Sequence, residues 1–440
     1  MRGALWACGL ALLVSAGSAP PRSVAATVEL PPRAQATSPQ DRIQHVVIIF
    51  QENRTPDNLF QGLPGADIQS FGYDARQRKV PLVPVALASS YDIDHGHPQF
   101  LAAFNEGKMN GWQREPIDCP TRQCPGATPF GYVPASQIGP YLTLAATYTF
   151  ADRMFQSNQG PSFPAHQFII AGTSADSPTS VLLAAENPVY YGNDYLNCGG
   201  SALTWVRMID PLGLETRVMH PCFDHLTMFD LLDAKKVSWR YYESYIGRAW
   251  SAPDAIAHIR YGPDWSDVSF PSSNVLSDIA RHQLPSVSWV IPPASASDHA
   301  RVNNGSGPTW VATIVNAIGE SSYWNNTAIF ISWDDWGGWY DHVRPPLYNS
   351  YELGFRVPLI VVSPYARPGY VSHVQHEFGS ILHFIEETYG LGSLGYTDVR
   401  ADDLSDCFNF SQPPIVYRPI STAGLPPVHL GPEDESPDND

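Results

Sequence analysis

Two adjacent carboxylates, Asp334 and Asp335, occupy a position in this sequence that suggests chemistry. They follow residues 328–332, an apolar run with the length and composition of a buried strand, and they precede a Gly-Gly turn. In an open α/β sheet, ligands bind outside the carboxyl ends of the strands. Two anions held side by side repel each other unless a cation or a proton lies between them. The pair therefore predicts a divalent metal ion and, with it, a metal-dependent hydrolase.

A second pair of oxygen donors, Glu52 and Asn53, ends another apolar run at residues 45–50. Asn53 could instead cap a helix or a turn, and only the combination with the 334–335 pair favours a ligand role. The four residues then form one candidate metal site at the ends of two strands. Such an all-oxygen set favours Ca, Mg or Mn.

Ser162 lies at the centre of a rigid turn, Gly160-Pro161-Ser162-Phe163-Pro164. The turn lacks the Gly-x-Ser-x-Gly pattern, so an ordinary serine-esterase triad is unsupported. A serine alkoxide held on a metal is the other way to activate this hydroxyl. The alternative is a turn serine that only bonds to the backbone.

Three histidines lie near predicted strand ends. His95 and His97 are two residues apart, and His299 follows the predicted strand 286–291. Imidazoles in such places can bind phosphate oxygens or protonate a leaving group. Asp341 and His342 either support the site from behind or close the Gly-Gly turn, and the sequence leaves both open.

Strand–helix alternation with long insertions predicts an α/β fold, a three-layer α/β/α sandwich around a mostly parallel sheet. The chain of 440 residues is long enough for one such domain, expected over residues 42–410. Residues 411–440 are rich in Pro and acidic residues, and are expected to form a partly disordered tail. The expected strands are 45–50, 237–242, 286–291, 328–332 and 357–362, and the expected helices are 226–236, 309–321 and 377–389.

The formal net charge of −17 argues against non-specific nucleic-acid binding and offers no basic patch for anionic lipid. A metal ion can reverse the sign locally, so an anionic ester remains a possible substrate. Residues 1–26 have the basic start, apolar run and small residues of a secretory signal, and residues 27–41 form a flexible lead-in. The protein is therefore expected to be secreted or periplasmic, without a stable membrane anchor.

Export permits disulfides among the five cysteines that follow the signal. Cys119 and Cys124 would close a short loop, and Cys198 with Cys222 is the next plausible pair, which leaves Cys407 over. Sequence alone does not fix this connectivity.

Taken in order, several motifs closely resemble the bacterial phosphoesterase family, which contains exported phospholipases C and an acid phosphatase on an alkaline-phosphatase-like fold. The motifs are the 45–54 segment with Glu52-Asn53-Arg54, the Ser162 turn, Asp298-His299, Trp333-Asp334-Asp335-Trp336-Gly337-Gly338, Gly354-Phe355-Arg356-Val357-Pro358 and Ser363-Pro364-Tyr365. The likeness runs from about residue 43 to residue 390.

The resemblance implies a role for each candidate residue. Glu52, Asn53, Asp334 and Asp335 would bind the metal. Ser162 would also touch the metal and act as nucleophile through a phosphoserine-like intermediate. His95, His97 and His299 would contact the phosphate or the leaving group, and the choice between His95 and His97 stays open. The fold resemblance leans towards Zn, so Ca, Zn, Mg and Mn all remain candidates.

The resulting hypothesis is an exported, metal-dependent phosphoesterase in which His299 protonates the leaving oxygen. Its partner would be a small phosphate ester or a phospholipid head group. The chain is shorter than the large haemolytic phospholipases C, which favours a phosphatase or a general phosphoesterase. The alternatives are a phospholipase C acting on phosphatidylcholine-like lipids and a non-catalytic secreted binding protein on the same fold.

Overall fold

The computed structural model describes residues 38–120 and 124–431. The expected signal, most of the lead-in and residues 432–440 lie outside these ranges. Within them, the central sheet has eight strands in the order β14-β13-β15-β1-β16-β17-β8-β18. Their bounds are β1 His45–Gln51, β8 Thr149–Ala151, β13 Trp239–Tyr242, β14 Val268–Ser269, β15 Val287–Val290, β16 Thr327–Trp333, β17 Leu359–Val362 and β18 Tyr370–Ser372. Only β17 runs against its neighbours among these strands, which confirms the mostly parallel sheet.

The two central strands, β1 and β16, are buried on both faces, which explains their continuous apolar sequences. They pair in parallel over their whole length, with Phe50 opposite Ser332 and Gln51 opposite Trp333. Both strands therefore end at the same level, and the residues that follow them emerge side by side at one edge of the sheet.

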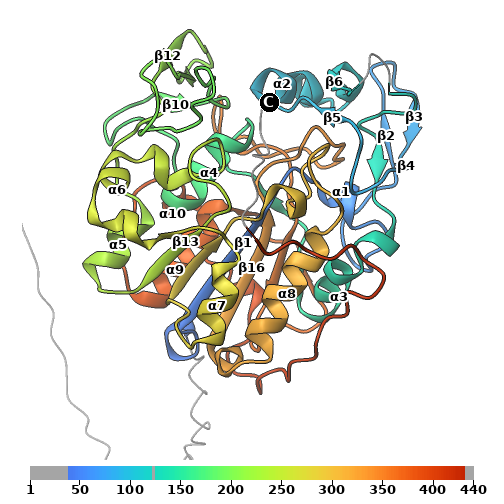
Figure 1. Ribbon diagram of the computed structural model, residues 1–440. Helices are drawn as coiled ribbons and strands as arrows, with labels where there is room; N and C mark the ends of the chain where they lie inside the picture. The colour runs from blue at the N-terminus through green and yellow to red at the C-terminus, as the bar shows by residue number, and fades with distance from the viewer. Residues whose placement is uncertain (1–37, 121–123, 432–440) are drawn as a thin grey trace, which may run out of the picture. The chain divides into compact units, whose positions relative to one another are not determined.

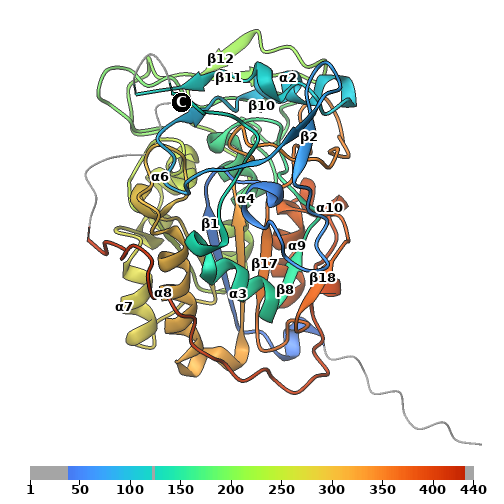
Figure 2. The ribbon, with the colours of Figure 1, turned by 90° about the vertical axis from the view of Figure 1, so that its right-hand side faces the viewer.

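Helices cover both faces of the sheet and complete the predicted three layers (Figures 1 and 2). One layer contains α3 (Gly139–Thr147), α7 (Asn274–Ala280) and α8 (Gly307–Gly319). The other contains α4 (Ser162–Ala171), α5 (Met228–Ala234), α6 (Ala257–Tyr261), α9 (Phe378–Tyr389) and α10 (Thr397–Arg400). The expected helices at 226–236, 309–321 and 377–389 correspond to α5, α8 and α9.

Long insertions lie beyond the carboxyl ends of β1 and β16, at the top of Figures 1 and 2. One carries α1 (Pro56–Leu59), α2 (His97–Phe104) and the short strands β2 (Phe71–Tyr73), β3 (Lys79–Pro81), β4 (Val83–Pro84), β5 (Asp92–Ile93), β6 (Ile117–Asp118) and β7 (Gly131–Tyr132). Another forms a small antiparallel sheet of β10 (Leu183–Ala184), β11 (Val206–Ile209) and β12 (Arg217–Met219). A two-stranded pair, β9 (Met154–Phe155) with β19 (His376–Glu377), lies outside the main sheet.

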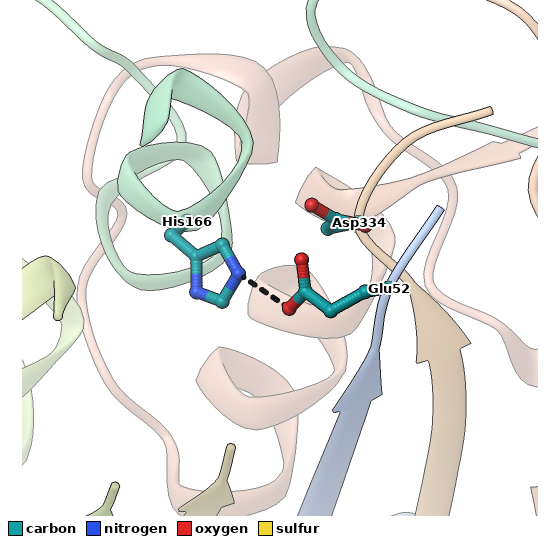
Figure 3. Close-up of side chains that lie close together, drawn as sticks. All are labelled: Glu52, His166 and Asp334. Atoms are coloured by element: carbon teal, nitrogen blue, oxygen red, sulfur yellow. Dashed lines mark hydrogen bonds and ion pairs between the residues drawn. The ribbon is translucent and has the colours of Figure 1, made fainter. Parts of the chain in front are cut away.

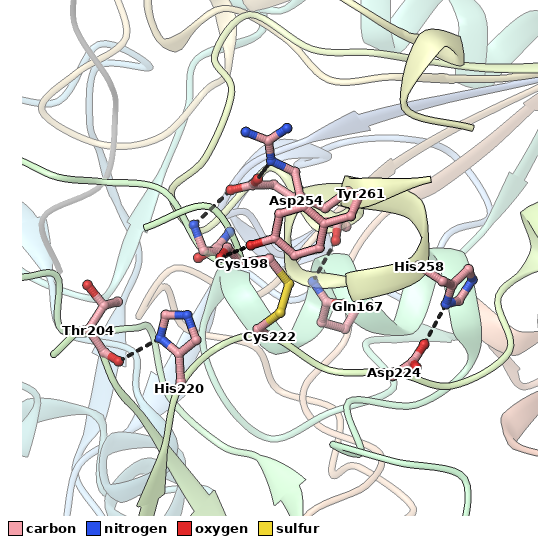
Figure 4. The surroundings of a disulfide bond; sticks show 12 residues. Gln167, Cys198, Thr204, His220, Cys222, Asp224, Asp254, His258 and Tyr261 are labelled. Carbon is pink, nitrogen blue, oxygen red and sulfur yellow. Dashed lines mark hydrogen bonds and ion pairs between the residues drawn. A yellow bond between two sulfur atoms is a disulfide. The ribbon is translucent and has the colours of Figure 1, made fainter. Parts of the chain in front are cut away.

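Both expected disulfides are present, Cys119–Cys124 and Cys198–Cys222, and Cys407 is a buried free thiol. The second disulfide lies beside Asp254 (Figure 4). The carboxylate of Asp254 accepts the Asn197 N–H at 2.7 Å, and its backbone carbonyl accepts the Cys198 N–H at 3.0 Å. This cluster anchors the insertion that carries β10–β12.

The segment 411–431, expected to belong to a partly disordered tail, runs along α8 and the start of β16. Thr309 Oγ1 donates to the Pro426 carbonyl at 2.8 Å, and Trp324 Nε1 donates to the Ile415 carbonyl at 2.8 Å. Among the described residues, no helix combines the length and the apolar character that a membrane crossing requires.

Candidate active site

The ends of β1 and β16 bring the two predicted oxygen pairs together. Glu52, Asn53, Asp334 and Asp335 are all fully buried, and the Asn53 N–H donates to Asp334 Oδ1 at 2.8 Å. The Gly-Gly turn makes this approach possible. Gly337 has φ 58°, and a β-carbon there would collide with the backbone carbonyl of Asn53.

Ser162 is the first residue of α4 and lies between these two strand ends. Its Oγ is 3.4 Å from Glu52 Oε2 and 3.5 Å from Asp335 Oδ2. His166, one helical turn further along α4, faces the same way and places Nε2 at 3.0 Å from Glu52 Oε1. Figure 3 shows Glu52, His166 and Asp334 pointing toward one another. His166 is a site residue that the sequence analysis missed.

The electrostatics of this group, the Asp334 cluster (Glu52, His166, Asp334 and Asp335), suit a bound cation. Burial, reinforced by the charge of Asp334, raises the pKa of Asp335 well above its ordinary value. Burial also lowers the pKa of His166 to about 4, so its imidazole is neutral and able to act as a ligand.

Buried oxygen atoms in the same place lack partners. Asn53 Oδ1 and Asp334 Oδ2 have no hydrogen-bond partner among the described residues. The side chain of the adjacent Arg54 does not neutralise these oxygens, because it donates its hydrogen bonds to the carbonyls of Leu87 and Asp298. Ligand atoms of Glu52, His166 and Asp334 lie within 4.8 Å of one another, a spacing that fits one divalent ion. The oxygen donors suit Ca, Mg or Mn, and the imidazole adds a donor that Zn favours.

The structure distinguishes His95 from His97, between which the sequence left the choice open. His95 Nε2 lies 2.8 Å from Asn53 Nδ2 and 3.7 Å from Asp335 Oδ2, and its Nδ1 donates to the Ile93 carbonyl. His97 turns away, with Nδ1 at 2.6 Å from Glu215 Oε1. His95 therefore lies beside Asn53 and Asp335, whereas His97 contacts Glu215 in the segment between β11 and β12.

His299 reaches the site from the segment after β15. Its ring centroid is 6.1 Å from that of His95, and its Nδ1 donates to the Ala300 carbonyl at 2.8 Å. The preceding Asp298, at φ 75°, accepts hydrogen bonds from Tyr141 and Trp333. Burial raises the pKa of Asp298 to about 6. These contacts fix the turn that presents His299.

A pocket of about 220 Å³ opens beside this group. Pro161, which precedes Ser162, and His95 form part of its wall. Asn187, also in the wall, accepts the Phe163 N–H at the first turn of α4 at 2.8 Å. The remaining lining residues are Asp94, Gly96, Gln99 and Glu186. Ser162 itself is fully buried and lies directly behind Pro161 in the chain.

A second group of charged residues is the Asp341 cluster, which consists of Asp57, Asp341, His342 and Arg356. Asp341 and His342 follow the Gly-Gly turn closely in the sequence. Arg356 binds Asp341 through two hydrogen bonds of 2.9 Å and lies 3.6 Å from Asp57. His342 Nδ1 lies 2.7 Å from Asp57 Oδ2. Asp341 and His342 thus belong to an internal ion-pair network that already contains its cation.

The protein is an α/β sandwich. At the carboxyl edge of its mostly parallel sheet, it has a buried carboxylate–histidine cluster and a serine hydroxyl. The sequence pattern of the Phosphoesterase family matches residues 43–392, and the chain belongs to this family. Family membership indicates a hydrolase of phosphoric esters.

Several similar proteins carry the name phospholipase C. The chain is 24% identical to "Non-hemolytic phospholipase C" of Pseudomonas aeruginosa over 89% of this chain and 61% of that protein. It is 24% identical to "Phospholipase C A" of Mycobacterium tuberculosis, covering 86% of this chain and 79% of that protein. "Non-specific phospholipase C6" of Arabidopsis thaliana is 27% identical, over 88% of this chain and 76% of that protein. The chain thus spans about three fifths of the Pseudomonas relative.

Solved structures also align over most of the chain. A protein in the alkaline phosphatase superfamily from Vibrio parahaemolyticus aligns with TM-score 0.37 and 11% identity, covering 83% of this chain and 70% of that one. The lipoteichoic acid synthase LtaP from Listeria monocytogenes gives TM-score 0.37 and 8% identity, covering 84% of this chain and 74% of that one. Similarity at this level supports no conclusion about ligands.

Proposed function

We propose that the protein is an exported, metal-dependent phosphoesterase that uses Ser162 as its nucleophile. The observation that carries the proposal is the position of Ser162 Oγ, 3.4 and 3.5 Å from carboxylate oxygens of Glu52 and Asp335 at two strand ends. The partnerless oxygens of Asn53 and Asp334 support a metal in the same place. The two disulfides support export.

The metal would be held by Glu52, Asn53, Asp334, Asp335 and the Ser162 hydroxyl, with His166 as a further donor. A bound divalent cation would lower the pKa of Ser162 and offset the charge that develops on the phosphoryl oxygens. Both effects favour attack by a serine hydroxyl at neutral pH.

In the first step, Ser162 Oγ forms a bond to phosphorus while the bond from phosphorus to the leaving oxygen breaks. The hydroxyl proton passes to the adjacent carboxylates, and His299 gives a proton to the leaving oxygen. His95 lies on the same side, where its Nε2 accepts a hydrogen bond from the Asn53 amide and so positions that proposed metal ligand.

In the second step, water attacks phosphorus and the bond from phosphorus to Ser162 Oγ breaks. His299 takes the proton of the water, and the carboxylate returns its proton to Ser162. The products are an alcohol and either inorganic phosphate or a phosphorylated head group, and the site residues regain their starting protonation.

Replacement of Ser162 by Ala tests the nucleophile. Ser162→Ala should leave the fold intact, as judged by circular dichroism, while turnover of a chromogenic phosphate ester falls by at least about 10³-fold, since the covalent route is lost. Near-normal turnover in this variant would remove Ser162 from the mechanism. His97→Ala provides the matched control, because His97 faces Glu215 and should change turnover much less.

A second candidate within this class is a phospholipase C for phosphatidylcholine-like lipids, favoured by the names of the relatives. Comparing p-nitrophenyl phosphate with p-nitrophenylphosphorylcholine would distinguish a monoesterase from this diesterase. A non-catalytic binding protein is the alternative outside the class. Absence of a bound ion, with no turnover after addition of Ca, Zn, Mg or Mn, would favour that alternative.

A further inference from the structure

The side chain of Arg54 is fully buried and directs its hydrogen bonds to uncharged oxygens. Its Nε and Nη2 both donate to the Asp298 carbonyl, at 3.0 and 2.7 Å. Nη2 also donates to the Leu87 carbonyl at 2.7 Å, and Nη1 donates to Asn58 Oδ1 at 3.2 Å. Burial of a guanidinium is unfavourable, but its planar fork can hold one carbonyl from two sides. The fork of Arg54 therefore fixes the backbone at Asp298.

Two links join the end of β1 to the turn after β15. The Glu52 N–H donates to the Ser297 carbonyl at 2.8 Å, and the Arg54 fork holds the next carbonyl, that of Asp298. The first link is made by the backbone alone, whereas the second depends on the Arg54 side chain. Because Glu52 is a proposed metal ligand and His299 follows Asp298, the two links set His299 relative to the proposed metal site.

The turn at Asp298 requires such restraint. Its φ of 75° lies in the left-handed region, which residues other than glycine seldom adopt. The Asp298 carboxylate accepts hydrogen bonds from two side chains, at 2.8 and 3.1 Å. The peptide group between Asp298 and His299 is held on both sides, its carbonyl by Arg54 and its N–H by Ser297 Oγ at 3.1 Å. Loss of the Arg54 fork would release one side of this peptide group.

We propose that Arg54 is the positioning residue for His299, and that its fork keeps the imidazole aligned with the leaving oxygen. The inference rests on the proposed function for the role of His299 as proton donor. Arg54 acts through the Asp298 carbonyl and is not itself a phosphate ligand, because four hydrogen bonds to protein oxygens engage its buried head group. One short segment thus supplies metal ligands, Glu52 and Asn53, and the anchor of the proton donor.

Esters that differ only in their leaving alcohol test this role. A p-nitrophenolate leaves readily without a proton, whereas a phenolate depends more strongly on the acid. Arg54→Lys keeps the charge but removes the planar fork. Turnover should fall about 10²-fold for the phenyl ester and less than about tenfold for the p-nitrophenyl ester of the same phosphoryl group. A loss by the same factor for both esters would overturn the proposal.

Arg356→Lys is the matched control. Arg356 is also fully buried and also donates to backbone carbonyls, those of Asp67 and Asp152, but it belongs to the Asp341 cluster. Any loss of turnover in Arg356→Lys should be the same for both esters, since it reflects stability alone. A control that changed the preference between the esters as much as Arg54→Lys would also overturn the proposal.

The His299→Ala background provides a second test. If Arg54 acts through His299, adding Arg54→Lys to His299→Ala should lower the turnover of the phenyl ester by less than about twofold further. Independent effects would instead multiply, and that result would contradict the proposal. If circular dichroism shows that Arg54→Lys does not fold, Arg54→Gln replaces it with the same expected results, because the amide donates hydrogen bonds without a buried charge.

The NMR signals of the histidine rings give a readout that requires no turnover. The His299 signals, identified by their absence in His299→Ala, should shift in Arg54→Lys and stay in place in Arg356→Lys. Unchanged His299 signals in Arg54→Lys would overturn the proposal whatever the esters showed. If the unmodified protein hydrolysed neither ester with Ca, Zn, Mg or Mn, the proposed function would fail, and these signals would still decide whether Arg54 positions His299.

Discussion

The Asp334 cluster and the Asp341 cluster each combine a histidine with buried carboxylates, some of which follow β16. Only the Asp341 cluster includes a cationic side chain, that of Arg356. In the Asp341 cluster, Arg356 binds Asp341 through two hydrogen bonds of 2.9 Å, and both side chains are fully buried. In the Asp334 cluster, Asp334 Oδ2 has no partner among the described residues, and the pKa of Asp335 is raised well above its ordinary value by burial and by Asp334.

The difference separates a structural role from a functional one. A buried carboxylate with an arginine partner is electrostatically satisfied within the chain. A buried carboxylate group without such a partner destabilises the fold until a proton or a ligand neutralises it. We therefore propose ligand binding for the Asp334 cluster and a structural role for the Asp341 cluster.

The largest expected effect comes from removing a charge of the Asp334 cluster. Asp334→Asn should reduce turnover of a chromogenic phosphate ester by about 10³-fold, since it would weaken the binding of the cation that we propose stabilises the transition state. In the unmodified protein, a divalent cation at 100 times its Kd should add about 2.7 kcal/mol to the free energy of unfolding. Thermal denaturation with and without the ion should show that this gain disappears in Asp334→Asn.

His342→Gln is the control for this experiment, because it alters the Asp341 cluster alone. It should retain both the turnover and the cation-dependent stabilisation. If His342→Gln lost the stabilisation as completely as Asp334→Asn, the assignment of the ligand to the Asp334 cluster would be wrong.

The second-largest expected effect is a loss of stability when Arg356 is replaced. Arg356→Met leaves the buried carboxylates of Asp341 and Asp57 without their cation, so the free energy of unfolding should fall by about 3–5 kcal/mol in urea titrations. Arg78→Met is the matched control, since Arg78 pairs with Asp74 while its side chain is 69% exposed. That loss should stay below about 1 kcal/mol. Equal losses in the two variants would contradict a structural role for the buried pair.

The sequence was sufficient to place together those candidate site residues that follow strand ends. Glu52, Asn53, Asp334 and Asp335 follow long apolar runs, and parallel strands of similar length end at one edge. Sequence could not show that β17 runs antiparallel, because its four residues are buried and apolar in either direction.

The residues that the sequence missed depend on local conformation or on distant contacts. His166 escaped notice because Ser162 was expected at the centre of a rigid turn, whereas Ser162 begins the helix α4. Recognition of that helix would have placed Ser162 and His166 on one face. The choice between His95 and His97 was open because Glu215, 118 positions further along the chain, holds His97 away from the site.

The smallest expected effect is a pH dependence confined to the Asp341 cluster. Burial disfavours the charged form of His342, but its hydrogen bond to Asp57 and the charges of Asp341 and Asp57 outweigh burial and raise its pKa. A raised folded-state pKa stabilises the fold fully below the unfolded value of about 6.5, and this contribution disappears as the pH rises through the folded pKa. His342→Gln should therefore cost about 1–2 kcal/mol at pH 5.5 and progressively less above pH 7. Urea titrations of both proteins across this range would reveal the convergence, and a difference that stayed constant with pH would show that His342 contributes by packing instead of by charge.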